Sequence, residues 1–247
     1  MRKLIIKIAI LVMALTPLAS FSSTPRPDAD EILRRVDQYR NPLHFFSVDV
    51  DLKLFHRDEN DEFSFRVYGN GTDGNLLEFR APAADKGKYY LMLKDDMWIY
   101  LPDASRPIRI SPLQRLAGEA SNGDVVRTAF TVDYTAELTG EDTVDERKAL
   151  VLSLKGRNAD MSYSTVKLWV AAESFEPIQA EFYALSGHLL KRAYFRTFGT
   201  MLGCRVVTSI EIQDAIRPDH KTVMTYSNLT SKHYPAKMFS QAYLGRW

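Results

Sequence analysis

The residues that most often catalyse reactions or hold metals form no familiar motif in this 247-residue sequence. No G-x-S-x-G element surrounds Ser186, which we expect in a hairpin turn, and no glycine-rich phosphate loop is present. The acidic pair Asp95-Asp96 is expected to be a solvated turn between strands. No H-E-x-x-H pair occurs, and the histidines are scattered without a cysteine partner for a metal: His44, His56, His188, His220 and His233. We expect no catalytic residue, metal or cofactor, with a secreted hydrolase that pairs acids from separate strands as an alternative.

Binding of an apolar ligand is the function that the remaining chemistry supports. Burial of an acyl chain gains about 0.8 kcal/mol for each CH₂ group, so a dry concave wall is enough to hold a lipid. The candidate wall consists of aromatic, leucine and methionine side chains on expected strands: Phe63, Phe65, Phe79, Tyr89, Leu91, Met92, Trp98 and Tyr100. Ordinary packing in the protein core is the alternative role for each of them.

Strands must position these side chains, and the sequence predicts many of them. Alternating apolar residues from Phe46 to Leu54 indicate a strand with one buried and one polar face. The runs 89–93 and 97–101 predict an aromatic hairpin. Further strands are expected near 63–67, 77–79, 106–110, 132–139, 148–155, 163–170, 177–184, 189–197, 204–213 and 221–229. Glycine-containing turn signals, among them 139–142 and 198–199, are expected to separate them.

Four short helical segments accompany the strands. Residues 27–39 have a capping-box pattern in Asp28 and Glu31, followed by apolar residues on one face. Ser111-Pro112 predicts a helix that contains Leu113, Leu116 and Ala117 and ends at Gly118. Further helices are expected over 125–130, with Asp124 as N-cap, and over 235–244. Because an apolar sheet face must be covered, we predict a mainly β half-barrel with helices over its mouth; a β-sandwich is the alternative.

The first residues predict export. Arg2 and Lys3 precede an apolar run and the small residues around Ser22, so residues 1–22 are expected to be a signal peptide, with an uncleaved anchor as the alternative. Residues 23–247 then form a single domain, and loss of three positive charges moves the formal charge from +1 to −2, which argues against nucleic acid as a partner. The single cysteine, Cys204, lies far from the cleavage site. We expect a soluble periplasmic protein with neither lipid anchor nor internal disulfide.

The segment 86–124 joins the aromatic hairpin to a proline, an arginine-containing loop and small turns. Its characteristic residues are Trp98, Tyr100, Pro102, Arg106, Arg109, Gly118 and Asp124. This order resembles the LolA-like family of periplasmic outer-membrane lipoprotein-sorting proteins, and the resemblance extends from about Asp28 to the C-terminus. It implies an incompletely closed antiparallel β-barrel with helices as a lid over an apolar cavity.

The resemblance also implies a function and partners. A family member would be a monomeric carrier, not an enzyme, for the acyl chains of lipoproteins or another envelope lipid. It would exchange cargo with an inner-membrane transporter and an outer-membrane acceptor. The alternatives are an accessory lipid-binding subunit of an inner-membrane lipid exporter and an integral outer-membrane barrel.

Arg80 is the residue to which the resemblance assigns a role in cargo release. In LolA-like carriers an arginine just before a proline ties the lid helices, and here one extra residue separates Arg80 from Pro82. A guanidinium has five donors for such bonds. The alternative is a solvent-facing strand arginine. Arg106 and Arg109 are weaker candidates for contact with a partner or a phosphate.

Overall fold

The computed structural model describes residues 27–56, 59–71, 74–94, 96–126, 129–157, 161 and 163–246. The predicted signal peptide, Asp95 and Trp247 lie outside these residues.

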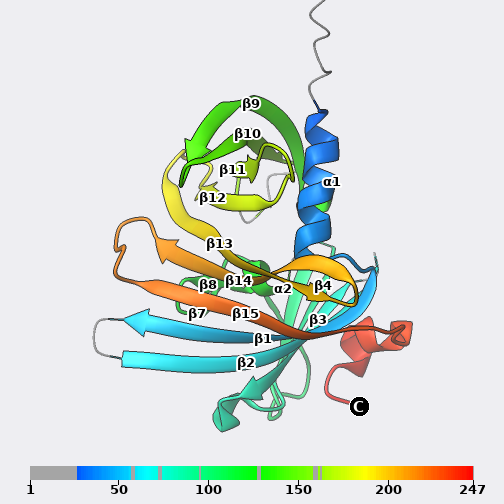
Figure 1. Cartoon of the computed structure of the whole chain (residues 1–247). Coiled ribbons are helices and arrows are strands. Elements are labelled where there is room, and N and C mark those ends of the chain that lie inside the picture. Colours follow the sequence, from blue (N-terminus) through cyan, green and yellow to red (C-terminus); the bar gives the residue numbers. More distant parts are fainter. Residues whose placement is uncertain are drawn as a thin grey trace, which may run out of the picture.

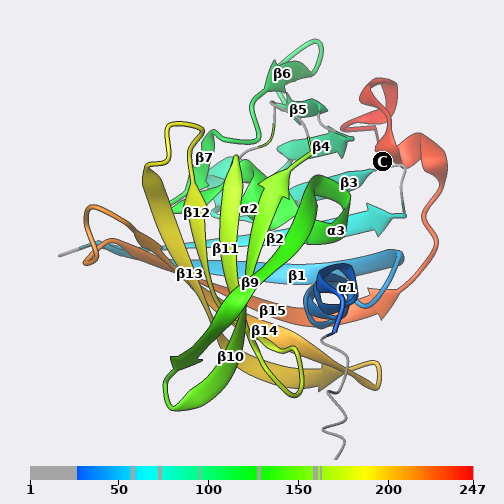
Figure 2. The same ribbon diagram turned by 90° about the horizontal axis from the view of Figure 1, so that it is seen from above.

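One large antiparallel sheet dominates the molecule. Its 13 strands follow the order β6-β5-β4-β3-β2-β1-β15-β14-β13-β12-β11-β10-β9, so the first strand pairs with the last. The strands are β1 (Phe45–His56), β2 (Glu59–Asn70), β3 (Asn75–Ala81), β4 (Tyr89–Leu93), β5 (Asp96–Tyr100), β6 (Ile108–Ile110), β9 (Tyr134–Val144), β10 (Arg147–Gly156), β11 (Thr165–Ala171), β12 (Pro177–Tyr183), β13 (Leu189–Met201), β14 (Cys204–Asp214) and β15 (Lys221–Ser231). The sheet curls without pairing its edge strands β6 and β9 (Figures 1 and 2). The predicted half-barrel is confirmed, and the β-sandwich is not the fold.

Helix α1 (Ala29–Arg40) covers the concave side, which we call the inner face of the sheet. Asp28 is its N-cap and accepts a hydrogen bond from the amide of Asp30 at 3.4 Å, as the capping pattern predicts. The helix contacts β9 and β14 with a buried apolar side that includes Ile32, Leu33 and Val36, and Figure 2 shows it end-on. Of two further short helices, α3 (Phe130–Asp133) contacts α1, and α2 (Asn122–Val126) contacts β3 and the strand β8 (Ala120–Ser121). No helix in the described ranges has the length and apolar character needed to span a bilayer.

The inner face of the sheet and α1 share one large apolar core. A separate cluster lies on the outer face of β3–β5, where the C-terminal segment packs through Phe239 and Leu244. Gly245 has φ +75°, and a Cβ there would lie 2.2 Å from a ring carbon of Tyr100. The outer face is therefore partly apolar at β3–β5, unlike the polar face that alternation over residues 46–54 indicates. The helix expected over 235–244 is instead two 3₁₀ turns, Ala236–Phe239 and Gln241–Tyr243.

The helix predicted around Leu113 and Leu116 is wrong. Leu113 precedes, and Leu116 belongs to, a small hairpin of β7 (Arg115–Ala117) and β8 (Ala120–Ser121), whose turn needs the positive φ of Gly118, +54°. Asp124 does not begin a later helix either. It lies in the first turn of α2 and accepts a hydrogen bond from the amide of Ser121 at 2.8 Å, as in a capping box.

Two predicted turns lie inside strands. The segment 139–142 belongs to β9, and 198–199 belongs to β13. Register shifts opposite Val151 and after Phe195 show that β-bulges accommodate these segments, so each strand bends instead of ending. The chain reverses farther on, at Asp145-Glu146 and Leu202-Gly203, where φ is positive.

Candidate functional site

The eight predicted wall residues divide between the two faces of the sheet. Four belong to the inner core or pack against it: Phe63, Phe65, Phe79 and Met92. The other four belong to the outer cluster beneath the C-terminal segment: Tyr89, Leu91, Trp98 and Tyr100. None of the eight lines either of the two cavities described below. The sequence pattern thus located strands with apolar faces but not the cavities on the inner face of the sheet.

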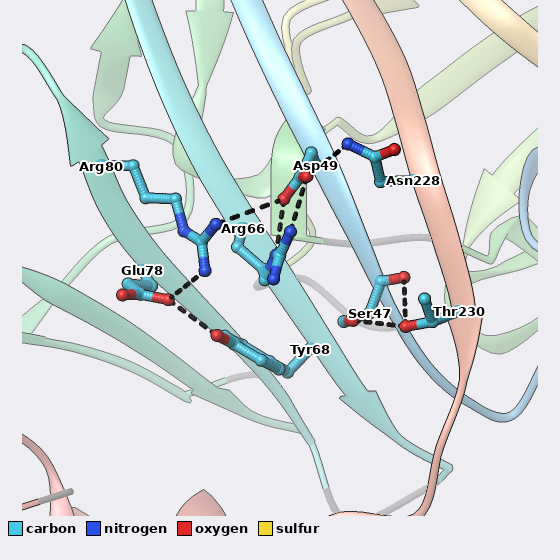
Figure 3. A network of polar contacts seen from close by, with 8 residues as sticks. All are labelled: Ser47, Asp49, Arg66, Tyr68, Glu78, Arg80, Asn228 and Thr230. Atoms are coloured by element: carbon cyan, nitrogen blue, oxygen red, sulfur yellow. Dashed lines mark hydrogen bonds and ion pairs between the residues drawn. The ribbon is translucent and has the colours of Figure 1, made fainter.

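Arg80 lies on the outer face of β3, because it alternates with Leu77 and Phe79 of the inner core, and Figure 3 shows it within a network of polar side chains. Its guanidinium is 3.3 Å from the carboxylate of Glu78 and 3.8 Å from that of Asp49. Asp49 also accepts two hydrogen bonds from Arg66, at 2.5 and 2.6 Å, and one from Asn228. Among the described residues, Glu78 lies on β3 itself, and the others lie on β1, β2 and β15 of the same sheet. Arg80 therefore contributes to a polar network on the sheet surface.

The other two loop arginines are also at the surface. Arg109 on β6 forms an ion pair with Asp96 on the neighbouring strand β5, and its side chain is mostly exposed. Arg106 lies exposed in the loop before β6. In the described part of the chain, no contact places either side chain on the inner face of the sheet.

The network around Asp49 predicts a loss of stability in acid. Burial alone would raise the pKa of Asp49, but hydrogen bonds from Arg66 and Asn228 outweigh it and lower the pKa below its ordinary value of 3.8. A carboxyl group with a lowered folded-state pKa stabilises the fold above the unfolded value, and this contribution is lost as the pH falls through the folded value. Below about pH 4, the urea midpoint of the wild type should fall more steeply than that of Asp49→Asn. Asp51→Asn, on the same strand, is the control; equal slopes for all three proteins would refute the role of Asp49.

Two neighbouring cavities lie on the inner face of the sheet, at the C-terminal end of α1. They hold about 650 and 600 Å³ of space between atoms, open mouths included. The first is walled mainly by Phe130, Tyr134, Tyr163, Phe182, Phe195 and Ile212. The second is walled mainly by Phe46, Val50, Val67, Val207, Tyr226 and Leu229. Arg40, Asp124 and Ile210 line both, so the two hollows adjoin at these residues.

The roof of the cavities is held by the C-terminal half of α1. The buried carboxylate of Asp37 accepts hydrogen bonds from the backbone amides of Phe130 and Thr131, at 2.7 and 2.8 Å, and from the Thr131 hydroxyl at 2.7 Å. It thereby holds the start of α3. The Arg40 guanidinium stacks 4.1 Å from the centre of the Phe130 ring and lies 3.9 Å from Asp37. Tyr39 donates a hydrogen bond to the Ser174 carbonyl at 2.9 Å.

A buried ion pair forms the polar end of the first cavity. The ammonium group of Lys191 contacts the Asp124 carboxylate, and the two side chains are only 7% and 9% exposed. The Tyr163 hydroxyl donates to Asp124 at 3.1 Å and lies 3.0 Å from the Ser121 hydroxyl. Burial lowers the pKa of Lys191, an effect that Asp124 opposes, and burial raises the pKa of Tyr163. The cluster offers donors to a ligand oxygen at the end of an apolar hollow.

Sequence reasoning missed most of these site residues, although one of them left a signal. Lys191 alternates with Leu189, Ala193 and Phe195 and therefore interrupts an apolar strand face. Buried lysines are rare without a partner, so such an interruption indicates a paired or functional group. Arg40 gives no comparable signal, because a basic residue in the last turn of a helix is ordinary.

Comparisons with known proteins agree with this architecture. A protein-family model described as an uncharacterized protein matches residues 71–246, and no curated protein matches the sequence. A crystal structure of a LolA superfamily protein from Nitrosomonas europaea has 34% identity and a TM-score of 0.82, with 87% of this chain and 99% of that chain covered.

Two more distant structures share the fold. An outer membrane lipoprotein-sorting protein domain, as its description has it, from Vibrio parahaemolyticus has 20% identity and a TM-score of 0.73, covering 88% of this chain and 98% of its own. A DUF1329 family protein from Desulfovibrio piger has 24% identity and a TM-score of 0.72, with 87% and 97% covered. Because the 34% identity extends over nearly the whole of the Nitrosomonas protein and most of this chain, the chain belongs to the LolA superfamily.

Proposed function

We propose that this protein is a periplasmic carrier that binds the acyl chains of lipoproteins or of another envelope lipid, without catalysis. The observation that supports the proposal is the pair of adjoining apolar cavities at the C-terminal end of α1, which meet at Arg40. Apolar side chains form most of the walls of both cavities, as in other sites that bind small apolar molecules. Membership of the LolA superfamily agrees with this function.

The composition of the cavity walls suits an acyl chain with a polar end. Each buried CH₂ contributes about 0.8 kcal/mol, so a chain in the hollow gains affinity without directional contacts. The Tyr163 hydroxyl and Lys191 would meet an ester or head-group oxygen. Burial raises the pKa of Tyr226, in the second cavity, to about 12, so its hydroxyl stays a neutral hydrogen-bond donor.

We assign the lid-holding role to Arg40 in addition to the proposed release role of Arg80. Arg40 belongs to α1, contacts Phe130 of α3 and lines both cavities. An arginine that joins the lid helices above the ligand needs this position. Arg80 contacts only strand residues among the described partners. Cargo would enter when α1 and α3 move from the sheet, and would pass from an inner-membrane transporter to an outer-membrane acceptor.

A cavity-filling variant tests the proposal. We expect lipid extraction and mass spectrometry of detergent-free protein to find an acylated species, and a fluorescent fatty acid to bind in competition with it. Ala193→Trp places an indole in the first cavity and should weaken fatty-acid binding about 10-fold or more, equivalent to about 1.4 kcal/mol. Leu190→Trp is the matched control, because Leu190 lies on the same strand with a 40% exposed side chain.

The outcomes separate the alternatives. Lipid-free wild-type protein that takes up no fatty acid would refute the carrier function. Equal binding by the two tryptophan variants would place the ligand outside the first cavity. The chemical class of the extracted lipid distinguishes lipoprotein sorting from service to a lipid exporter. Release rates of Arg40→Leu and Arg80→Leu, measured side by side, show which arginine holds the lid.

A further inference from the structure

Two histidines far apart in the sequence meet a buried glutamate at the end of the half-barrel near the small hairpin β7–β8 (Figure 1). His56 ends β1, His220 immediately precedes β15, and Glu119 lies in the turn between β7 and β8. The two Nδ1 atoms are 3.0 Å apart, and His220 Nδ1 is 3.9 Å from Glu119 Oε1. One potential ligand atom from each side chain lies within 4.8 Å of the others.

The fold holds all three residues in place. Pairing of β1 with β15 sets Phe55 opposite Lys221, so the next residues at this end of the ladder are His56 and His220. The hairpin turn presses against the same two strands: a Cβ on Gly118 would lie 2.2 Å from Thr222 Oγ1. The amide of Glu119 donates to that oxygen at 2.8 Å, and Thr222 is fully buried. This backbone contact between the β7–β8 turn and β15 therefore places the Glu119 carboxylate beside the two histidines.

The side chains have the chemistry of a transition-metal site. Bonds of about 2.0–2.2 Å to imidazole nitrogen or carboxylate oxygen place neighbouring ligand atoms about 3 Å apart, close to the observed Nδ1 separation. Two imidazoles and one carboxylate suit Zn²⁺, Cu²⁺ or Ni²⁺ better than Mg²⁺ or Ca²⁺, which prefer oxygen ligands.

We propose that His56, Glu119 and His220 bind one divalent late transition-metal ion, with Zn²⁺ as the probe to use first. The site is separate from the cavities, whose lining includes none of the three residues. The bound ion would link the β7–β8 hairpin to β1 and β15. Without metal, the two rings form an ordinary hydrogen bond, in which one Nδ1 donates and the other accepts.

Titration of chelator-treated full-length protein with ZnCl₂ tests the proposal. We expect one ion per chain by calorimetry, no comparable binding of Mg²⁺, and a rise of the melting temperature with Zn²⁺. His56→Ala, His220→Ala and Glu119→Gln should each weaken Zn²⁺ binding at least about 10-fold, since loss of even an outer partner costs about that much. His188→Ala is the matched control, because that histidine is exposed in the β12–β13 turn.

The variants must be folded for the comparison to count, so each is first checked by circular dichroism without metal. Glu119→Gln keeps the shape of the side chain and serves if a histidine variant does not fold. Co²⁺ offers a second readout, because its visible absorption bands report the coordinating atoms. Absence of a 1:1 Zn²⁺ complex in the wild type, or unchanged affinity in the folded His56→Ala and Glu119→Gln variants, would overturn the proposal.

Discussion

Replacement of Asp124 with alanine is expected to lower the free energy of unfolding by about 3–5 kcal/mol, the usual cost of breaking a buried ion pair. Asp124 is the carboxylate that contacts the Lys191 ammonium, and the Lys191 side chain is 7% exposed. Without Asp124, the charged form of Lys191 would be buried without its counterion beside Tyr163 and Phe182. Urea unfolding at neutral pH measures the loss.

The pH dependence of the Asp124→Ala variant has a definite sign. Burial lowers the pKa of Lys191, and removal of Asp124 removes the interaction that opposes this effect. The unfolded chain then binds more protons than the folded chain in the range between the two pKa values, so stability rises with pH there. We expect the deficit of Asp124→Ala relative to the wild type to shrink toward alkaline pH.

A double-mutant cycle supplies the control. Lys191→Met keeps the length of the side chain and removes its charge, so Asp124→Ala combined with Lys191→Met should recover part of the loss. If the two single changes in unfolding free energy simply add, Asp124 and Lys191 do not interact energetically. The ion pair then does not stabilise the polar end of the first cavity. The same variants separate stability from function when fatty-acid binding is measured on those that fold.

Predictions from neighbouring residues in the sequence agreed best with the structure. Helix α1 follows from the Asp28 cap and the apolar spacing of Ile32, Leu33 and Val36. The aromatic hairpin β4–β5 follows from two alternating runs around a short turn. Failures arose where packing outweighed local preference. Around Gly118 a hairpin replaced a helix, because the turn presses against Leu54 and Thr222.

The candidate sites depend on pairings that a single sequence does not reveal. The cavities bring together Arg40 from the first helix, Asp124 from the second and Lys191 from β13. His56 and His220 meet only because the first strand of the sheet pairs with the last. Because the histidines are far apart in the sequence, their spacing indicated no metal site. Aromatic content likewise predicted strands with apolar faces, while the position of the cavities depends on where the end of α1 and the helices α2 and α3 meet the sheet.

Asp37 controls the lid in the proposed mechanism, and Asp37→Ala is the prediction that tests it. The variant loses a carboxylate that accepts two backbone amides and a hydroxyl at the start of α3, and it leaves Arg40 without its nearest acid. We expect a loss of about 1–3 kcal/mol of unfolding free energy. If the roof opens for cargo, a bound fluorescent fatty acid should also dissociate about 10-fold faster, equivalent to about 1.4 kcal/mol.

Variants of the same helix and the same site make the Asp37 test specific. Asp30→Ala changes an exposed acid in the first turn of α1 and should alter neither quantity by much. Asp37→Asn keeps one acceptor oxygen and should fall between the wild type and Asp37→Ala in both measurements. Reduced stability with an unchanged dissociation rate would show that Asp37 only stabilises the fold and that cargo does not pass beneath α1 and α3. Faster dissociation that follows the weakening from wild type to asparagine to alanine would identify the contact between α1 and α3 as the gate.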